Sequence, residues 1–199
     1  ELRRALEQLG SQNLASMFLP FNDRKPDEGF TEKTVSELVR ASFEMAKVKT
    51  GALMVIERSA SLKDIERTGI DVDGLVTSQL LINIFEHNTP LHDGAVVIRG
   101  NRVAAATCYL PLSDNGSINK ALGTRHRAAV GISEVTDSLT IIVSEETGRV
   151  SLAEHGDLRK IDNADSLSQE LRGLLVREES GSRFRLWKGR QKDERKTDK

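Results

Sequence analysis

At 199 residues the chain is long enough for one domain with flanking segments and a sizeable core. Its hydrophobic fraction of 38%, charged fraction of 30% and net charge of -1 are those of an ordinary soluble globular protein. The near-neutral charge excludes a global field that would attract nucleic acid or an anionic membrane, so any affinity for phosphates must come from a local group of residues.

The single cysteine, Cys108, excludes an intramolecular disulfide. It lies in the apolar run 103–110, which favours a small buried side chain on a strand over a reactive thiol. No stretch reaches the roughly 18 apolar residues that a membrane helix needs, and no signal peptide is visible. These features fit a reducing cytoplasm.

Residues 1–30 are predicted to be the end of a helix followed by a linker, because an apolar stripe at 2–9 gives way to Ser, Asn, Pro, Asp and Gly. Thr31 is the expected cap of a helix whose apolar residues recur at helical spacing as far as Lys49. Gly51 ends this helix and precedes a buried strand over residues 52–56.

The middle of the chain contains an irregular stretch, a buried helix and a hairpin. Residues 64–72 show no clear period, whereas residues 78–85 are apolar nearly all round and are predicted to form a buried helix. Strands over 95–99 and 102–110 are joined by Gly100-Asn101, a two-residue loop typical of a hairpin.

After a polar loop at 111–121, the pattern predicts a helix over 124–133, a strand over 139–143, a further strand at 149–153 and a last helix over 166–176. Residues 177–199 are charged and lack periodicity, which predicts a disordered tail, although its two aromatic residues leave a docking or membrane-surface role open. The whole predicts one α/β domain over 31–176, with a central mixed β-sheet flanked by helices.

Three segments contain more polar chemistry than folding requires. The first places Asp93 and Gly94 at the mouth of a strand, where the missing Cβ of Gly94 would let a ligand approach the backbone. An ordinary Asp-Gly turn explains the same residues. His92 precedes Asp93 and could ligate a transition metal, whereas His87 and His155 have the polar context of surface histidines.

The second segment, 123–129, opens a helix with Arg125, His126 and Arg127. Cations at a helix N-terminus are unfavourable for the helix itself, so a bound polyanion explains them better than a pair of surface arginines does. Because residues two apart point about 200° away from each other, we expect one of the two arginines to reach a given phosphate.

The third segment, Ser144-Glu145-Glu146, ends a strand with a hydroxyl and two carboxylates. A plain hairpin turn accounts for it, and so does a site for a hard cation, which prefers oxygen ligands. Spacing and composition alone therefore predict an α/β domain that binds a phosphorylated ligand, with or without a metal.

At these three segments the sequence resembles the diadenylate cyclase family. Residues 91–96 match the family's DGA motif, residues 123–129 match its RHR motif, and residues 144–146 follow in the expected order. The resemblance runs from about residue 31 to residue 153 and includes the membrane-bound CdaA-type subgroup, whose catalytic domain follows N-terminal transmembrane helices. It implies the diadenylate cyclase fold and the condensation of two ATP into cyclic di-AMP with release of two pyrophosphates.

The resemblance also implies roles. Asp93, Gly94, Arg125 and His126 would be catalytic, and Asp93, His92 and Glu145 would hold Mn²⁺, Mg²⁺ or Co²⁺, with Glu146 a less certain member. A metal is favoured because a carboxylate alone is a weak base for an alcohol. The nucleotide-binding residues would be Gly94, Ala95, Tyr109, Leu110, Gly123, Thr124, Arg125, His126, Arg127, Ser144 and Glu145. Tyr109 would lie on adenine, and a buried aromatic in the core is the alternative.

The implied assembly is a face-to-face homodimer, with a YbbR-domain regulator and phosphoglucosamine mutase as partners, no nucleic acid, and a cytoplasmic catalytic domain anchored in the bacterial cell membrane through helices that would precede residue 1. A non-catalytic sensor of ATP or cyclic di-AMP is the alternative function. Asp93 argues against it, because a carboxylate facing phosphate repels unless a metal intervenes. A metal-dependent phosphohydrolase would need a richer His/Asp cluster.

Overall fold

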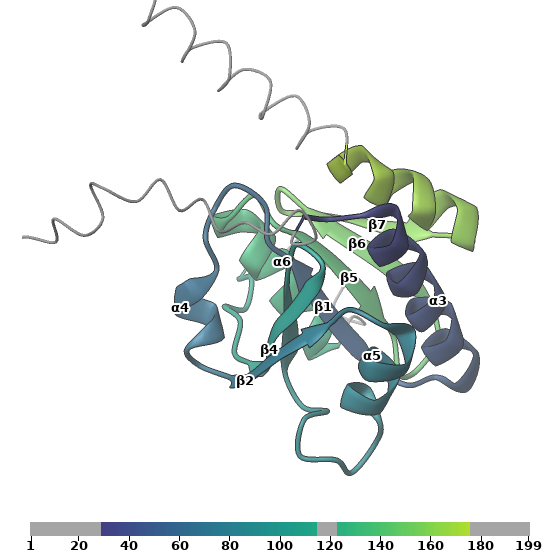
Figure 1. Cartoon of the computed structure of the whole chain (residues 1–199), viewed down its shortest axis with the longest axis horizontal. Helices are drawn as coiled ribbons and strands as arrows, with labels where there is room; N and C mark the ends of the chain where they lie inside the picture. Colours follow the sequence, from purple (N-terminus) through teal and green to yellow (C-terminus); the bar gives the residue numbers. More distant parts are fainter. Residues whose placement is uncertain (1–28, 115–122, 176–199) are drawn as a thin grey trace, which may run out of the picture.

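The computed structural model describes residues 29–114 and 123–175, so the predicted helix end at 2–9 and the charged tail lie outside the described residues. A seven-stranded sheet with the strand order β2-β4-β3-β1-β5-β6-β7 forms the centre of the domain (Figure 1). Strands β1 and β3 are parallel, and the other pairs of neighbouring strands in these ranges are antiparallel. The predicted α/β domain with a mixed sheet is therefore confirmed.

Helices and strands alternate along the chain except at three antiparallel hairpin connections, β3–β4, β5–β6 and β6–β7. Their bounds are α3 Glu32–Val48, β1 Ala52–Ile56, α4 Lys63–Glu66, β2 Ile70–Leu75, α5 Ser78–Phe85, β3 Ala95–Arg99, β4 Arg102–Cys108, α6 Thr124–Val135, β5 Leu139–Val143, β6 Val150–Glu154 and β7 Asp157–Ile161. A helix over 164–175 closes the described part of the chain.

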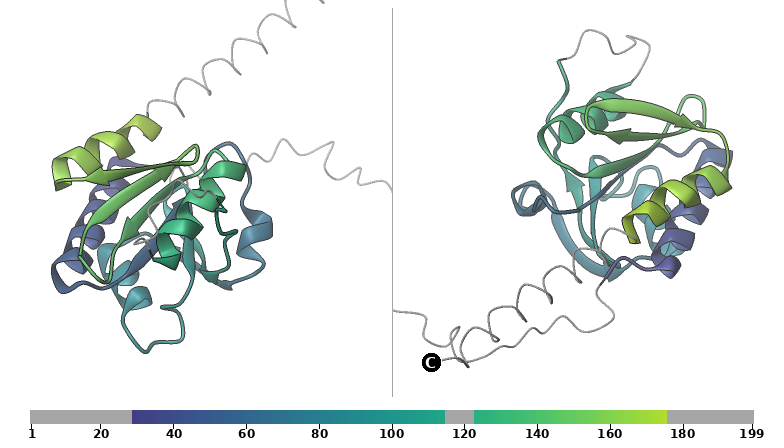
Figure 2. Two further views of the ribbon diagram at one scale, coloured as in Figure 1. Left: turned by 180° about the vertical axis from the view of Figure 1, so that it is seen from behind. Right: turned by 90° about the horizontal axis from the view of Figure 1, so that it is seen from above.

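Both faces of the sheet are covered by helices. Helices α3, α5 and 164–175 pack on one face and enclose a core that includes Leu38, Leu81 and Leu171. Helix α6 packs on the other face, where Ala129 and Ile132 meet Val55 (Figure 2). Strands β1 and β5 are buried along their whole length, which agrees with their uninterrupted apolar sequences. No helix in the described ranges is both long and apolar enough to cross a bilayer.

Helix ends follow local capping chemistry. The Thr31 hydroxyl accepts a hydrogen bond from the Thr34 N–H at 3.2 Å, as expected from the sequence, and Thr77 caps α5 in the same way through Leu80. Helix α3 ends at Lys49, which is left-handed with a φ of 57°. The predicted hairpin is also present, with Arg99 and Arg102 paired on either side of Gly100-Asn101.

Strands β2 and β7 were not predicted from the sequence, and β4 and α6 end at other residues than predicted. The stretch 64–72, predicted to be irregular, contains α4 and the start of β2, and β7 was not predicted. Both strands lie at the edges of the sheet and are largely solvent-exposed, so neither carries a continuous apolar signal. Strand β4 ends at Cys108 instead of residue 110, and α6 extends two residues beyond the predicted end at 133.

Candidate functional site

The strand register gathers the three polar segments at one edge of the sheet. Ala52 at the start of β1 pairs with Val143 at the end of β5. In the parallel pair, Met54 lies beside Val96, so β1 and β3 begin at the same edge. Ala95 at the start of β3 pairs with Cys108 at the end of β4. The residues just outside these four strand ends are therefore neighbours, although they are up to 94 positions apart in sequence, from 51 to 145.

Gly94 is required by the backbone of the neighbouring strand. Its φ is 105°, and a Cβ added to it would lie 2.8 Å from the carbonyl carbon of Thr107. Thr107 is itself left-handed with a φ of 56°, at a register shift between β3 and β4. The backbone of β4 occupies the space in which a Cβ of residue 94 would lie. This contact alone explains the glycine, without the expected approach of a ligand.

Asp93 lies in an exposed position between the half-buried Leu91 and the buried Ala95. Leu91 packs against the core before it, and Ala95 is buried after it. Within the described ranges the Asp93 carboxylate has neither a hydrogen-bond nor an ion-pair partner. An exposed carboxylate on a fixed backbone, without a protein partner, is available to a ligand.

His92 is held by the loop that it belongs to. Its Nδ1 lies 2.6 Å from the carbonyl oxygen of Thr89. A carbonyl only accepts, so Nδ1 carries the proton and donates it, and Nε2 of the neutral ring keeps a free lone pair. This tautomer suits a metal ligand, whose second ring nitrogen commonly donates to a backbone carbonyl.

The N-terminus of α6 lies at the same edge. Gly123 caps the helix without a side-chain hydrogen bond, and the first turn has no acidic residue. The Arg125 guanidinium donates to the Glu145 carboxylate at 2.5 Å, which joins the second segment to the third. Arg127 instead donates to the carbonyl of Ser113 at 3.1 Å, so the two arginines serve different neighbours.

Glu145 and Ser144 both have local partners. Glu145 is committed to Arg125, and the Ser144 hydroxyl accepts from the Thr147 N–H at 3.2 Å within the turn between β5 and β6. In the conformation described, no three His, Cys, Asp or Glu side chains of these ranges converge as a metal cluster. A cation at Asp93 and His92 would therefore draw further ligands from the substrate or from a rearranged Glu145.

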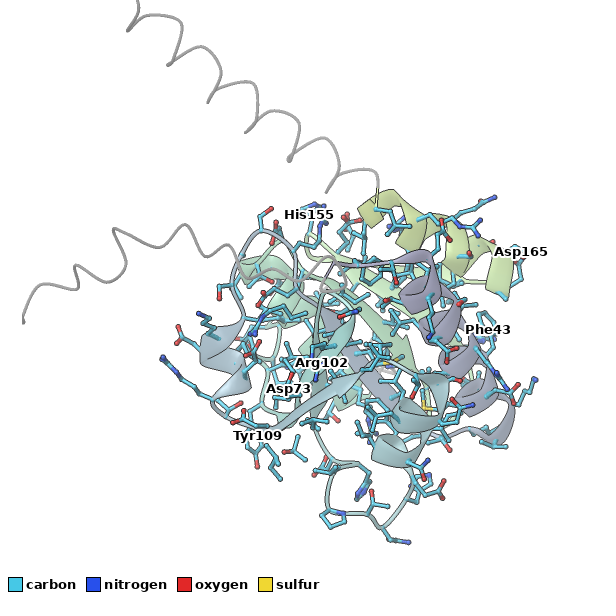
Figure 3. The ribbon with its side chains drawn as sticks, in the orientation of Figure 1. Phe43, Asp73, Arg102, Tyr109, His155 and Asp165 are labelled. Atoms are coloured by element: carbon cyan, nitrogen blue, oxygen red, sulfur yellow. The ribbon has the colours of Figure 1, made fainter. Side chains whose placement is uncertain are left out.

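Tyr109 is the most exposed of the large hydrophobic side chains, with 77% of its surface accessible. Figure 3 places it at the periphery of the domain, at the opposite end from His155. Its N–H donates to the Thr68 hydroxyl at 2.9 Å, which fixes the backbone at the end of β4. The alternative of a core aromatic is wrong, and the ring is free to meet a ligand. Leu110 beside it is half-buried.

His126 lies beneath this surface and is buried. Burial lowers the pKa of its imidazole below the ordinary value of 6.5, and the nearby Glu146 opposes the shift. His126 is therefore neutral at pH 7. Protonating His126 therefore destabilises the folded state relative to the unfolded chain.

This burial predicts a pH dependence of stability. Because the folded pKa lies below the unfolded one, the unfolded chain binds more protons between the two values, and stability falls as the pH drops below about 6.5. In His126→Gln the loss of melting temperature between pH 7.5 and pH 5.5 should be smaller than in the unchanged chain. Equal losses in both proteins, measured by differential scanning calorimetry, would contradict this assignment.

Two glycines that the sequence patterns did not single out for function also shape the site. Gly51 is buried, and an added Cβ would lie 2.9 Å from Glu145 Oε2 and 3.1 Å from the Arg125 guanidinium carbon. Gly131 in α6 lets the segment after β4 lie against the helix, since an added Cβ would be 2.2 Å from the Pro111 carbonyl oxygen. Both contacts join distant segments, so no local pattern indicated them.

Comparisons with known proteins identify the family of this chain. The domain family described as DAC, DisA bacterial checkpoint controller nucleotide-binding, matches residues 39–158. Cyclic di-AMP synthase CdaA of Bacillus subtilis is 51% identical over 193 residues, which cover 96% of this chain and 68% of that protein. The chain belongs to the diadenylate cyclase family. The family resemblance expected from the DGA and RHR motifs is thereby confirmed.

Further relatives extend the comparison. A diadenylate cyclase of Listeria monocytogenes is 47% identical over 195 residues, which cover 95% of this chain and 68% of that protein. The crystal structure of a double mutant of DacA from Staphylococcus aureus superposes with a TM-score of 0.70 at 48% identity, covering 72% of this chain and 95% of that one. These likenesses show that the diadenylate cyclase fold extends over the described domain.

Proposed function

We propose that this chain condenses two ATP molecules into cyclic di-AMP and two pyrophosphates, at the sheet edge formed by the starts of β1 and β3 and the ends of β4 and β5. The observation that carries the proposal is the register, which gathers Asp93, Tyr109 and Glu145 at this one edge, where Arg125 pairs with Glu145. Relatives at 47% and 51% identity bear the names diadenylate cyclase and cyclic di-AMP synthase.

The nucleotide is assigned to this edge by complementary chemistry. The exposed Tyr109 ring and Leu110 offer an apolar surface for adenine. The start of α6, with Thr124 and Arg125, suits the triphosphate and the charge that develops on leaving pyrophosphate. The neutral His126 supports this turn from below. Gly123, Gly94 and Ala95 contribute backbone only.

In the proposed reaction each ribose 3′-hydroxyl gives up its proton to water, and its oxygen forms a bond to the α-phosphorus of the other ATP. The bond between the α-phosphorus and the bridging oxygen to the β-phosphate breaks, and pyrophosphate leaves with the negative charge. Asp93 and the Nε2 of His92 would hold the divalent cation, Mn²⁺, Mg²⁺ or Co²⁺, which when bound lowers the pKa of the hydroxyl and neutralises phosphate charge. Glu145 would complete the metal environment, and in the structure its carboxylate is held by Arg125.

Each chain supplies half of a symmetric reaction. Cyclic di-AMP has two identical 3′-to-5′ linkages related by a two-fold axis, and the edge described here offers one set of site residues. Two copies facing each other, each with one ATP, satisfy this symmetry, and a closed two-fold contact is the commonest arrangement of homo-oligomers. We therefore propose a face-to-face homodimer that bound nucleotides help to bridge.

The reaction is tested by incubating the chain with ATP and Mn²⁺ and separating the products by mass. Cyclic di-AMP with pyrophosphate supports the proposal. Unchanged ATP would indicate the non-catalytic sensor, and ADP or AMP with inorganic phosphate a phosphohydrolase. Either of these outcomes would refute cyclase activity.

Arg125→Ala and Arg127→Ala should have unequal effects on ATP binding. Arg125 lies beside Glu145 at the strand ends, and losing a charge-assisted phosphate contact costs about 1.5–3 kcal/mol, or roughly 10- to 150-fold in affinity. Arg127 also holds the carbonyl of Ser113, so its loss should weaken ATP binding less and loosen the segment after β4. Calorimetric titration with ATP and metal measures the affinity of each variant. Unchanged affinity in both variants would show that the triphosphate does not bind at this helix start.

Family membership also supports the wider assembly implied by the sequence. We propose a membrane anchor through helices preceding this domain, with a YbbR-domain regulator and phosphoglucosamine mutase as partners. A solved relative from Bacillus cereus, 42% identical, bears the description of a hypothetical membrane spanning protein. Co-purification of the full-length protein with each partner from detergent-solubilised membranes tests these contacts.

A further inference from the structure

Thr68 connects the short helix α4 to the end of β4. Its hydroxyl accepts a hydrogen bond from the Tyr109 N–H at 2.9 Å and donates its own proton to the Ile65 carbonyl at 2.6 Å. A hydroxyl has one proton, so the bond to Ile65 leaves its lone pairs for Tyr109. The two bonded residues are 41 positions apart in sequence, and both lie just outside the regular elements.

The segment that contains Thr68 is fixed on both sides of α4. Leu62, the residue before the helix, is buried. After the helix, a Cβ added to Gly69 would lie 2.6 Å from the Sγ of Cys108, so the backbone at residue 69 lies directly against β4. This contact holds Thr68 in place beside Tyr109.

Tyr109 has few other contacts that could orient it. It follows the last residue of β4, and 77% of its surface is accessible. Within the described ranges its phenol hydroxyl has no hydrogen-bond partner, and its ring has no aromatic neighbour. The direction in which the ring leaves the chain therefore depends on the backbone at residue 109, which Thr68 holds.

We propose that Thr68 is a positioning residue for the nucleotide, which holds the backbone of Tyr109 so that the ring is in place for adenine before ATP binds. The inference rests on the proposed function, because that function places adenine on Tyr109. Thr68 does not touch the substrate and acts through Tyr109. A ring that is already in place loses less conformational freedom on binding, so the hydrogen bond strengthens ATP binding without taking part in the reaction.

Thr68→Val removes the acceptor for the Tyr109 N–H and keeps the shape of the side chain. The dissociation constants of ATP and AMP, measured by calorimetry, should rise about two- to tenfold, the usual effect of losing one neutral hydrogen bond. The KM for ATP should rise by a similar factor with kcat nearly unchanged, because adenine stays bound in the ground state and in the transition state. Pyrophosphate, which has no adenine, should bind equally well to the variant and to the unchanged protein.

Thr68→Ser and Thr136→Val are the matched controls. Serine keeps the hydroxyl, so Thr68→Ser should bind ATP like the unchanged protein. The Thr136 hydroxyl also accepts a backbone N–H, that of Ser138 at 3.3 Å, but it follows α6 at the end opposite to Arg125. Thr136→Val should therefore leave ATP and AMP binding unchanged. A loss in Thr68→Ser as large as that in Thr68→Val would contradict the positioning role.

Tyr109→Ala separates this inference from the proposed function. Thr68→Val added to Tyr109→Ala should cause no further loss of ATP affinity, because the ring on which it acts is gone. If Thr68→Val weakens ATP binding equally with and without the ring, or not at all, Thr68 is not a positioning residue and the proposed nucleotide site stands. If Tyr109→Ala binds ATP like the unchanged protein, adenine does not lie on Tyr109, and the role of Thr68 falls with that assignment. Far-UV circular dichroism checks the fold of each variant, and Thr68→Ala replaces Thr68→Val if valine prevents folding.

Discussion

Asp93→Asn is expected to lower cyclic di-AMP formation by orders of magnitude, because a bound cation supplies several kcal/mol of charge stabilisation in the transition state. The amide keeps the shape of the side chain and loses the charge that holds the cation. Asp93 is exposed and without a protein partner in the described ranges, so the fold should survive. ATP affinity should change far less, because Arg125 and the start of α6 bind the triphosphate. Product mass, calorimetry with ATP and circular dichroism measure the three quantities.

Asp162→Asn is the matched control for this experiment. Asp162 is also exposed, but it follows β7 on the edge strand most distant from β4 in the sheet order. The same loss of charge there should leave turnover unchanged. Near-normal cyclic di-AMP production by Asp93→Asn would show that Asp93 is not the metal ligand.

Gly94→Ala should be among the most destabilising single changes in the domain. At a φ of 105° any side chain is strained, which costs about 1–3 kcal/mol. The new Cβ would also lie within 2.9 Å of the Thr107 backbone, and overpacking adds about 1–3 kcal/mol. A total loss of about 2–6 kcal/mol in the free energy of unfolding is expected from urea titration, together with loss of activity because Asp93 moves with its neighbour.

Gly173→Ala provides the comparison for stability. Gly173 lies in the helix over 164–175, and an added Cβ meets no atom within 4 Å. Because alanine favours a helix over glycine by about 1 kcal/mol, this variant should be equally stable or more stable. If Gly94→Ala unfolds at the same urea concentration as the unchanged protein, the close approach of β4 does not constrain this turn.

The central elements of the fold could be predicted from local sequence because their signals are strong. Strands β1 and β5 are continuous apolar runs, and Thr31 and Thr77 supply the hydroxyls that begin α3 and α5. The edge strand β2 could not be predicted in this way. It lies at the edge of the sheet, with a left-handed Asp73 at a φ of 44° and a register shift, and the alternation of apolar and polar residues over 70–73 does not correspond to a buried face.

In the candidate site, too, the individual residues could be predicted from local sequence, whereas their arrangement could not. The sequence indicated Asp93, Arg125 and Glu145 as separate motifs. Only Arg125 conflicts with a local rule, since cations are unfavourable at a helix start, whereas ordinary turns also account for Asp93 and Glu145. Their assembly depends on strand register, which one sequence does not reveal. That register produces the ion pair between Arg125 and Glu145. It also brings the backbone of Gly51 so close to both side chains that a Cβ would not fit there.

The face-to-face arrangement of two half-sites is tested most directly by specific activity on dilution, with the linear intermediate pppApA followed in the same samples. If each 3′-hydroxyl attacks the ATP of the other copy, activity per mole of enzyme should fall once the chain is diluted below the dimer dissociation constant. Mixed dimers with one Asp93→Asn subunit should then accumulate pppApA, because one of the two linkages still forms. Specific activity that stays constant down to concentrations where sedimentation finds only monomer would contradict the two-fold mechanism.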